Sequence, residues 1–238
     1  MRSLLTILIL FLTTTIVLGQ DASSSNQQHE IFIKGGIGTS WIILPKVFII
    51  SPDDSITNAQ ILPATNGFTG YAGLQTVFPL GAGWLFVPEV NLSYTSGEIR
   101  VNRTEYQFIG TDTIRSSETA QKLQSYVRAE IPLHFGVRSK DNFWVSFGPT
   151  LYFTLHDNKG FNNAVYELPV QADLKLNSNV AFGVRFRLAA YAPIGERSYI
   201  DIKFESDLGQ YFTFEEDSYK AKFSLQNLSI GYGYLLNK

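Results

Sequence analysis

The sequence contains no cysteine, and its 238 residues include one methionine and three histidines. Without cysteine the chain has no disulfide, no thiolate metal site, no cysteine nucleophile and no lipid-modified cysteine. The histidines His29, His134 and His156 are far apart in the chain, which argues against a site with several histidine ligands. We therefore expect neither a metal nor a cofactor.

Charge is also scarce. Charged residues make up 17% of the chain, below the ordinary fraction of about 25%. The formal net charge is −2, which gives nucleic acid no basic surface to bind. Hydrophobic residues reach 45%, the opposite of a disordered composition. A nucleic-acid partner and a disordered chain are both excluded.

The one long apolar run stands at the start of the sequence. Residues 4–18 are almost uninterrupted in apolar character, Arg2 precedes them, and Gly19 follows as a small residue. The run is shorter than the ~20 residues that a spanning helix needs. It predicts a signal peptide over residues 1–19, followed by a flexible mature N-terminus over residues 20–29.

From residue 30 onward, apolar and polar residues alternate with a period of two, which is the signature of β-strands. Eight strands are predicted, at about residues 31–43, 68–80, 84–97, 123–138, 143–156, 179–192, 199–212 and 220–236. The apolar face changes near Gln226 and Asn227, which predicts a bulge there. Pro88, Pro132 and Pro149 fall within strands, and because proline cannot donate to a ladder we expect bulges at all three.

The connections between these strands alternate in length. Long ones lie at about 45–66, 98–122 and 157–178, and tight turns lie at about 79–83, 139–142 and 193–198. This pattern is typical of bacterial outer-membrane barrels, with long loops outside and short turns in the periplasm. The predicted fold is all-β: an eight-stranded antiparallel up-and-down transmembrane β-barrel over residues 30–238. A secreted soluble β-protein is the alternative.

The charges of the predicted inner face favour the membrane barrel, because six acids stand against six bases. A narrow lumen requires such matching, since a desolvated charge must find a partner. Inward side chains just fill the interior of an eight-stranded barrel, so we predict a plugged lumen. Together with His134, the predicted charge network contains Glu30, Lys34, Glu89, Arg128, Glu130, Arg138, Arg185, Arg187, Asp201, Lys203, Glu205 and Asp207.

Aromatic residues near the ends of the predicted strands face away from this network. They are predicted to form girdles at the two membrane interfaces. The set is Trp41, Phe68, Trp84, Tyr94, Phe143, Phe153 and Phe212.

Three strand motifs resemble the PorT-like outer-membrane β-barrel family of Gram-negative bacteria. They are FVPEVNLSY at residues 86–94, YVRAEIPLHF at 126–135 and FWVSFGPTLY at 143–152. The resemblance covers the chain from about Glu30 to its end. It implies the barrel fold and the outer-membrane location, and no activity is carried over from it.

We expect a protein without enzymatic activity, with a structural or binding role carried by its extracellular loops. A narrow channel for solutes or ions is an alternative, and an outer-membrane lipid-modifying enzyme is another. The enzyme would need a nucleophile beside a base; His156 is expected to point inward, with Ser93 and Ser96 on a strand that is not its neighbour. The expected partners are outer-membrane lipid, the barrel-assembly machinery and an extracellular ligand or protein, and the barrel is expected to be a monomer.

Overall fold

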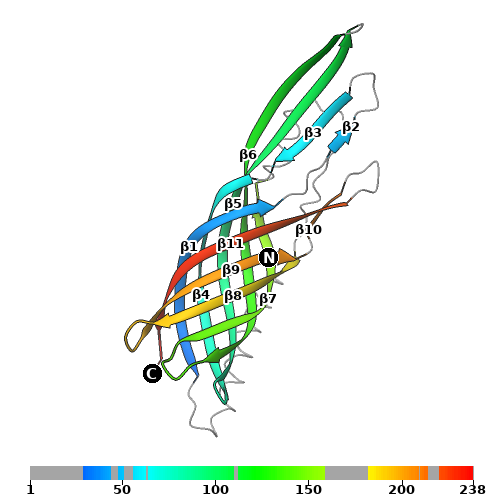
Figure 1. The fold of residues 1–238 in the computed structure, drawn as a ribbon. Coiled ribbons are helices and arrows are strands. Elements are labelled where there is room, and N and C mark those ends of the chain that lie inside the picture. Colours follow the sequence, from blue (N-terminus) through cyan, green and yellow to red (C-terminus); the bar gives the residue numbers. More distant parts are fainter. Residues whose placement is uncertain are drawn as a thin grey trace.

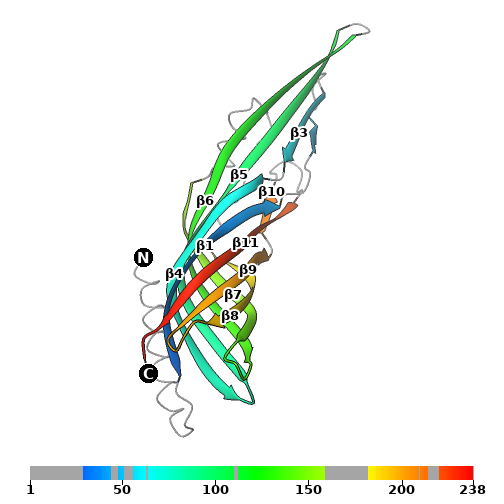
Figure 2. The same ribbon diagram turned by 60° about the vertical axis from the view of Figure 1, so that its left-hand side comes forward.

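The computed structural model of the protein is a closed barrel with a long projection at one end (Figures 1 and 2). It describes residues 29–43, 48–50, 56–62, 64–109, 112–158, 182–208, 210–213 and 220–237. The predicted signal peptide, most of the predicted N-terminal segment and most of the 157–178 connection lie outside the described residues. The domain boundaries therefore stay a prediction.

Eight antiparallel strands form the barrel. They are β1 (Glu30–Ile43), β4 (Ala64–Gly81), β5 (Trp84–Ile109), β6 (Asp112–Arg138), β7 (Trp144–Asp157), β8 (Phe182–Pro193), β9 (Ser198–Leu208) and β11 (Lys220–Leu235). The pairing order is β5-β4-β1-β11-β9-β8-β7-β6, and β6 pairs again with β5. The ring is thus closed, and the predicted eight-stranded antiparallel barrel is confirmed.

The two ends of the barrel differ in their connections. Short turns at 82–83, 139–143 and 194–197 gather at one end, where β1 also begins and β11 finishes; we call it the turn end. In the first of these turns, Gly81, Ala82 and Gly83 have φ of 93°, 49° and 81°. Two glycines suit that left-handed backbone. The opposite end is the loop end.

The connection predicted at 98–122 is not a loop. β5 and β6 stay paired in one register from Gly97 opposite Gln124 to Ile109 opposite Asp112. At about 3.4 Å per residue, the strands of this ribbon are roughly 40 Å long. The ribbon projects beyond the barrel (Figures 1 and 2). Sequence alternation does not distinguish a barrel wall from a free-standing hairpin, because both have a period of two.

Three further strands lie at the loop end: β2 (Phe48–Ile50), β3 (Ile56–Leu62) and β10 (Gln210–Thr213). β3 pairs with the projecting part of β5, from Ile56 opposite Tyr106 to Leu62 opposite Arg100. β2 pairs with β3, and β10 pairs with β11. The ribbon is therefore part of a small sheet of β2, β3, β5 and β6.

The strand prolines do not cause the predicted bulges. At each proline, two consecutive residue pairs are missing from the strand ladder. The gaps lie at Pro88 between β4 and β5, at Pro132 between β5 and β6, and at Pro149 between β6 and β7. The register is the same on both sides of each gap. Each proline removes a donor from the ladder, and the strand continues straight through.

The bulge predicted near Gln226 is also absent. β11 pairs with β1 and with β9 in continuous registers through Asn227. The apolar residue Leu225 therefore points into the lumen, where it is 1% exposed, instead of outward. Within the described strand pairs, register shifts lie between Ser40 and Ile42, between Pro79 and Gly81, and between Val127 and Arg128. The register of β11 also moves by one residue from β9 to β10.

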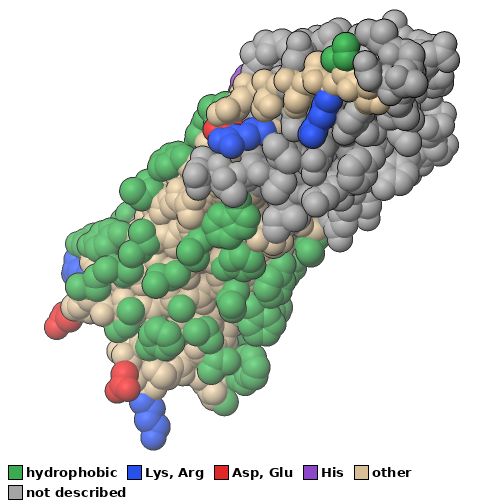
Figure 3. Space-filling view, turned by 45° about the horizontal axis from the view of Figure 1, so that its top comes forward, with side chains coloured by type: hydrophobic (Ala, Val, Ile, Leu, Met, Phe, Trp, Pro, Cys, Tyr) green, Lys and Arg blue, Asp and Glu red, His purple; other side chains and the backbone are tan. Residues whose placement is uncertain are grey.

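The outer wall is apolar and the interior is charged. Ile37, Ile202 and Ile230 are 60%, 56% and 54% exposed on the outside, whereas Arg185 and Asp201 are 0% exposed. Figure 3 shows hydrophobic side chains covering the barrel wall, with charged side chains toward its ends. A soluble barrel would have the reverse polarity, so this outer surface requires lipid. In the described residues, no helix is sufficiently long and apolar to cross a membrane.

The predicted girdle residues lie on this outer face. Phe68, Trp84, Tyr94 and Phe143 are between 38% and 51% exposed. Trp41 and Phe153 are partly exposed, and Trp41 donates to Gln226 Oε1 at 2.8 Å. The side chain of Phe212 lies outside the described part of the protein.

Candidate functional site

The predicted network residues project into the lumen from five strands, β1, β5, β6, β8 and β9. Ten of their charged side chains are buried, and none of the ten is more than 6% exposed. The acids are Glu89, Glu130, Asp201, Glu205 and Asp207, and the bases are Lys34, Arg128, Arg185, Arg187 and Lys203. Acids and bases therefore balance inside the barrel.

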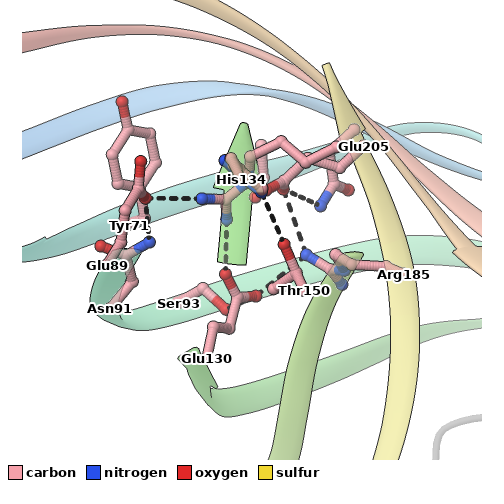
Figure 4. Close-up of polar contacts among 12 residues, drawn as sticks. Tyr71, Glu89, Asn91, Ser93, Glu130, His134, Thr150, Arg185 and Glu205 are labelled. Atoms are coloured by element: carbon pink, nitrogen blue, oxygen red, sulfur yellow. Dashed lines mark hydrogen bonds and ion pairs between the residues drawn. The ribbon is translucent and has the colours of Figure 1, made fainter. Parts of the chain in front are cut away.

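Four of these side chains form a closed ring of ion pairs (Figure 4). One carboxylate oxygen of Glu130 accepts from Arg185 Nη1 at 2.9 Å, and the other accepts from Arg187 Nη2 at 3.0 Å. One oxygen of Glu205 accepts from Arg185 Nη1 at 3.1 Å, and the other accepts from Arg187 Nε. Each arginine thus bridges two carboxylates and each carboxylate bridges two arginines, which is the condition under which a buried pair is tolerated.

Two branches extend the ring across the lumen. Arg187 Nη1 lies 2.7 Å from Glu89 Oε2, and Lys34 Nζ lies 2.6 Å from the other oxygen of Glu89. On the other side, Asp207 joins Arg185 Nε and Arg128 Nη1, both at 2.9 Å. A continuous chain of ion pairs therefore runs from Arg128 on β6 to Lys34 on β1.

Neutral side chains also donate hydrogen bonds to the Glu89 carboxylate. Gln75 Nε2 and Asn91 Nδ2 donate to it at 3.0 and 2.9 Å, and the Tyr191 hydroxyl donates at 3.3 Å. Glu89 is 1% exposed and holds a full set of donors without water.

Lys203 and Asp201 stand apart from the chain of ion pairs and meet at Tyr71. The Tyr71 hydroxyl donates to Asp201 Oδ1 at 2.8 Å, and Lys203 Nζ lies 2.8 Å from the centre of the Tyr71 ring. The phenol thus joins a buried cation and a buried anion through its ring face and its hydroxyl.

Large inward side chains pack onto inward glycines of neighbouring strands. A Cβ at Gly36 would lie 2.6 Å from the Tyr71 ring, and a Cβ at Gly183 or Gly233 would overlap the ring of Tyr152 or Tyr199. Each tyrosine ring occupies the volume that a side chain at the glycine would need. The glycines of the barrel wall therefore make room for the tyrosines in the lumen. The charge network and these tyrosines lie together in the interior.

The remaining network residues lie nearer the turn end. His134 is fully buried, and its Nε2 lies 3.3 Å from Thr150 Oγ1. Arg138 makes two hydrogen bonds with Glu30, at 3.1 and 2.5 Å, and these side chains are 19% and 30% exposed. Because β1 and β6 are not neighbours, this pair spans the mouth of the barrel.

Several residues of the site were not in the predicted network. Tyr71, Gln75 and Asn227 all bond to its carboxylates, as Asn227 Nδ2 does to Glu205 Oε2 at 3.2 Å. They occupy the same strand face as the charged residues, so the period of two could have found them. The prediction considered charge alone, and neutral polar side chains were left out.

His156 does not point inward as predicted. At the irregularity between Val127 and Arg128, Thr154 pairs with Arg128 and His156 pairs with Val127, which leaves Leu155 as the extra residue. This bulge turns His156 onto the outer face, where it is exposed. Ser93 lies inside, where its hydroxyl donates to Glu130 at 2.5 Å, so the structure does not bring the two together.

Comparison with known proteins finds similar solved structures. The outer membrane protein OprG from Pseudomonas aeruginosa is 12% identical, with a TM-score of 0.38 over 89% of this chain and 98% of that one. The outer membrane protease OmpT from Escherichia coli is 7% identical, with a TM-score of 0.37 over 87% and 97%. The translocator domain of the autotransporter NalP from Neisseria meningitidis is 9% identical, with a TM-score of 0.23 over 96% and 97%.

No family model and no curated protein matches the chain. The resemblance to the PorT-like family therefore stays a prediction. The TM-scores are low, so the assignment depends on the strand pairing, the apolar wall and the charged lumen. The protein is an outer-membrane-type β-barrel with a buried, charge-paired interior.

Proposed function

We propose that the protein is a non-conducting, monomeric anchor in the bacterial outer membrane, which holds a binding surface outside the cell. In this proposal it catalyses no reaction. The observation that carries it is the filled lumen, closed by a continuous chain of ion pairs, combined with a sheet that projects far from the barrel.

The filled interior supports the absence of conductance. A permeating ion would have to separate Arg185 and Arg187 from their shared carboxylates, all of which are buried. Separating a buried ion pair is strongly unfavourable. Tyrosine rings that pack on wall glycines occupy further parts of the lumen.

The projecting sheet supports a binding role. Short turns and both chain ends of an outer-membrane barrel face the periplasm, which would place the ribbon of β5 and β6 outside the cell. Its described side chains are exposed and mostly polar, including Arg100, Arg115 and Gln121, with Ile114 52% exposed near the tip. We propose that a ligand or protein partner binds there.

Two measurements test this proposal. The refolded chain from Gln20 should migrate faster on a denaturing gel before boiling than after it, and should show no conductance steps in a planar bilayer. Stable single-channel steps in a heat-modifiable preparation would overturn the non-conducting assignment.

The orientation is tested on intact cells. An epitope inserted between residues 110 and 111 should bind antibody without permeabilisation. The matched control places the same epitope between residues 140 and 141, in a turn, and should bind antibody only after permeabilisation. The reverse result would overturn the proposed exposure of the ribbon.

A further inference from the structure

The lumen is divided along its length into an aromatic zone and a charged zone. At the turn end, four aromatic side chains, Phe32, Trp144, Tyr191 and Tyr199, are all at most 5% exposed. Trp144 stacks on Tyr191 with ring centres 4.7 Å apart. Tyr199 contacts Phe32, Trp144 and Tyr191 edge to face at 5.0, 5.1 and 5.3 Å. We call these four rings the aromatic cluster.

Aliphatic side chains pack around the cluster and complete a layer across the barrel. Val77, Leu85 and Val87 are between 0% and 2% exposed and belong to the same core. The hydroxyls of Tyr191 and Tyr199 point toward the charged zone, where they bond to Gln75 at 3.2 and 2.5 Å. The polar edge of the cluster therefore faces the charges, and its rings face the turn end.

The charged zone above the cluster contains buried polar atoms without a hydrogen-bond partner, although one of them, Lys203 Nζ, faces the Tyr71 ring. Among the described residues, Lys203 Nζ, Asp201 Oδ2, Asn227 Oδ1 and Arg185 Nη2 are buried and have no hydrogen-bond partner. Buried polar atoms in native proteins bond to ordered water when protein partners are lacking. Toward the turn end, such atoms are Trp144 Nε1 of the aromatic cluster, His134 Nδ1 and Arg138 Nε. A larger number lies in the charged zone, where ordered water would satisfy them.

We propose that the aromatic cluster is the seal of the barrel against water. Water that reaches the charged zone stops at the aromatic rings, whereas the ion pairs exclude ions. The physical reason is that a charged, partly hydrated layer can exchange water one molecule at a time, whereas a packed apolar layer has no polar groups to replace the lost hydrogen bonds. The inference rests on the proposed non-conducting function and names the part of the molecule that stops water.

The test compares two kinds of substitution in the full mature chain. The seal variant is Trp144→Ala with Tyr199→Ala. The charge variant is Lys34→Met with Glu89→Gln, which removes the ion pairs of Glu89 with Lys34 and with Arg187 without changing the net charge. Phe147→Ala is the matched control, because Phe147 is 48% exposed on the outer face of the strand that carries Trp144. All three are refolded, checked for heat modifiability, and measured for bilayer conductance and for osmotic water permeability of vesicles.

We expect the seal variant to raise water permeability at least tenfold over the wild type. The water permeability of the charge variant and of the control should match that of the wild type. A raised water permeability in the charge variant with an unchanged one in the seal variant would overturn the inference, as would an unchanged water permeability in both. If the seal variant does not fold, Phe32→Ala and Tyr199→Ala are measured singly, and an unchanged water permeability in both counts against the inference.

This outcome is separable from the proposed function. Conductance in the wild type would contradict the proposed function itself. A wild type without conductance, together with folded seal variants whose water permeability is unchanged, would contradict only the location of the seal.

Discussion

A Cβ atom at position 231 would overlap the hydroxyl oxygen of Tyr71, so Gly231 on β11 is the residue that makes room for this tyrosine of β4. The same Cβ would lie 2.5 Å from Asp201 Oδ1, which accepts the Tyr71 hydrogen bond. The glycine therefore permits a polar contact that crosses the lumen between two other strands.

Gly231→Ala is expected to destabilise the barrel by about 1–3 kcal/mol, because overpacking displaces Tyr71 from Asp201 and from Lys203. The free energy of unfolding in urea, followed by the heat-modifiable band in vesicles, measures the effect. Gly70→Ala is the control, since a Cβ there meets Phe68 at an ordinary 3.4 Å. Equal stability of the two variants would show that the Tyr71 contact is not tightly packed.

Arg187→Met is expected to destabilise the protein by about 3–5 kcal/mol, because it leaves three buried carboxylates each short of a partner. These are Glu89, Glu130 and Glu205. The same urea titration measures the loss.

The matched control for Arg187 is Arg100→Met on the ribbon. Arg100 pairs with Glu98, and these side chains are 49% and 25% exposed. An exposed pair contributes about 0–1 kcal/mol, so this variant should unfold near the wild-type midpoint. If Arg187→Met were as mild as the control, the ion-pair chain would not be stabilising the closed lumen.

Asn237, which follows β11, bonds to the segment where β1 begins. Its Oδ1 accepts from the Ile31 amide at 2.6 Å, and its Nδ2 donates to the His29 carbonyl at 2.8 Å. Asn237→Ala should cost about 1 kcal/mol for each hydrogen bond lost, seen as a lower temperature at which the heat-modifiable band disappears. Asn237→Asp keeps the acceptor and should show a smaller loss, and an identical loss in the two variants would contradict this account.

The membrane face is tested with the tryptophans. Trp84 is 51% exposed on the outer wall, whereas Trp144 is 3% exposed inside. In variants that retain one tryptophan, the others replaced by phenylalanine, brominated lipids should quench Trp84 fluorescence and leave Trp144 nearly unchanged. Strong quenching of Trp144 would mean that the faces are assigned the wrong way round.

The strand number, the pairing type and the assignment of faces were predictable because a strand alternates its side chains locally. Residues 123–138 illustrate this, since the inward and outward sets follow from sequence position alone. The prediction was wrong at two places: where an extra residue interrupts the two-residue alternation of a strand, and where a strand continues past its predicted end. The extra residue Leu155 reverses the face of His156, and β5 and β6 continue as strands into a segment that looked like a loop.

The sequence by itself therefore determined the barrel, the apolar wall and the charged interior, because period and composition are properties of the chain. Which charges meet was decided by the tertiary structure. Arg187 and Glu89 are 98 residues apart and lie on β8 and β5, which are not neighbours. They meet because the strand order and register of the closed barrel bring both to one level of a narrow lumen, and those long-range constraints leave no trace in a local pattern.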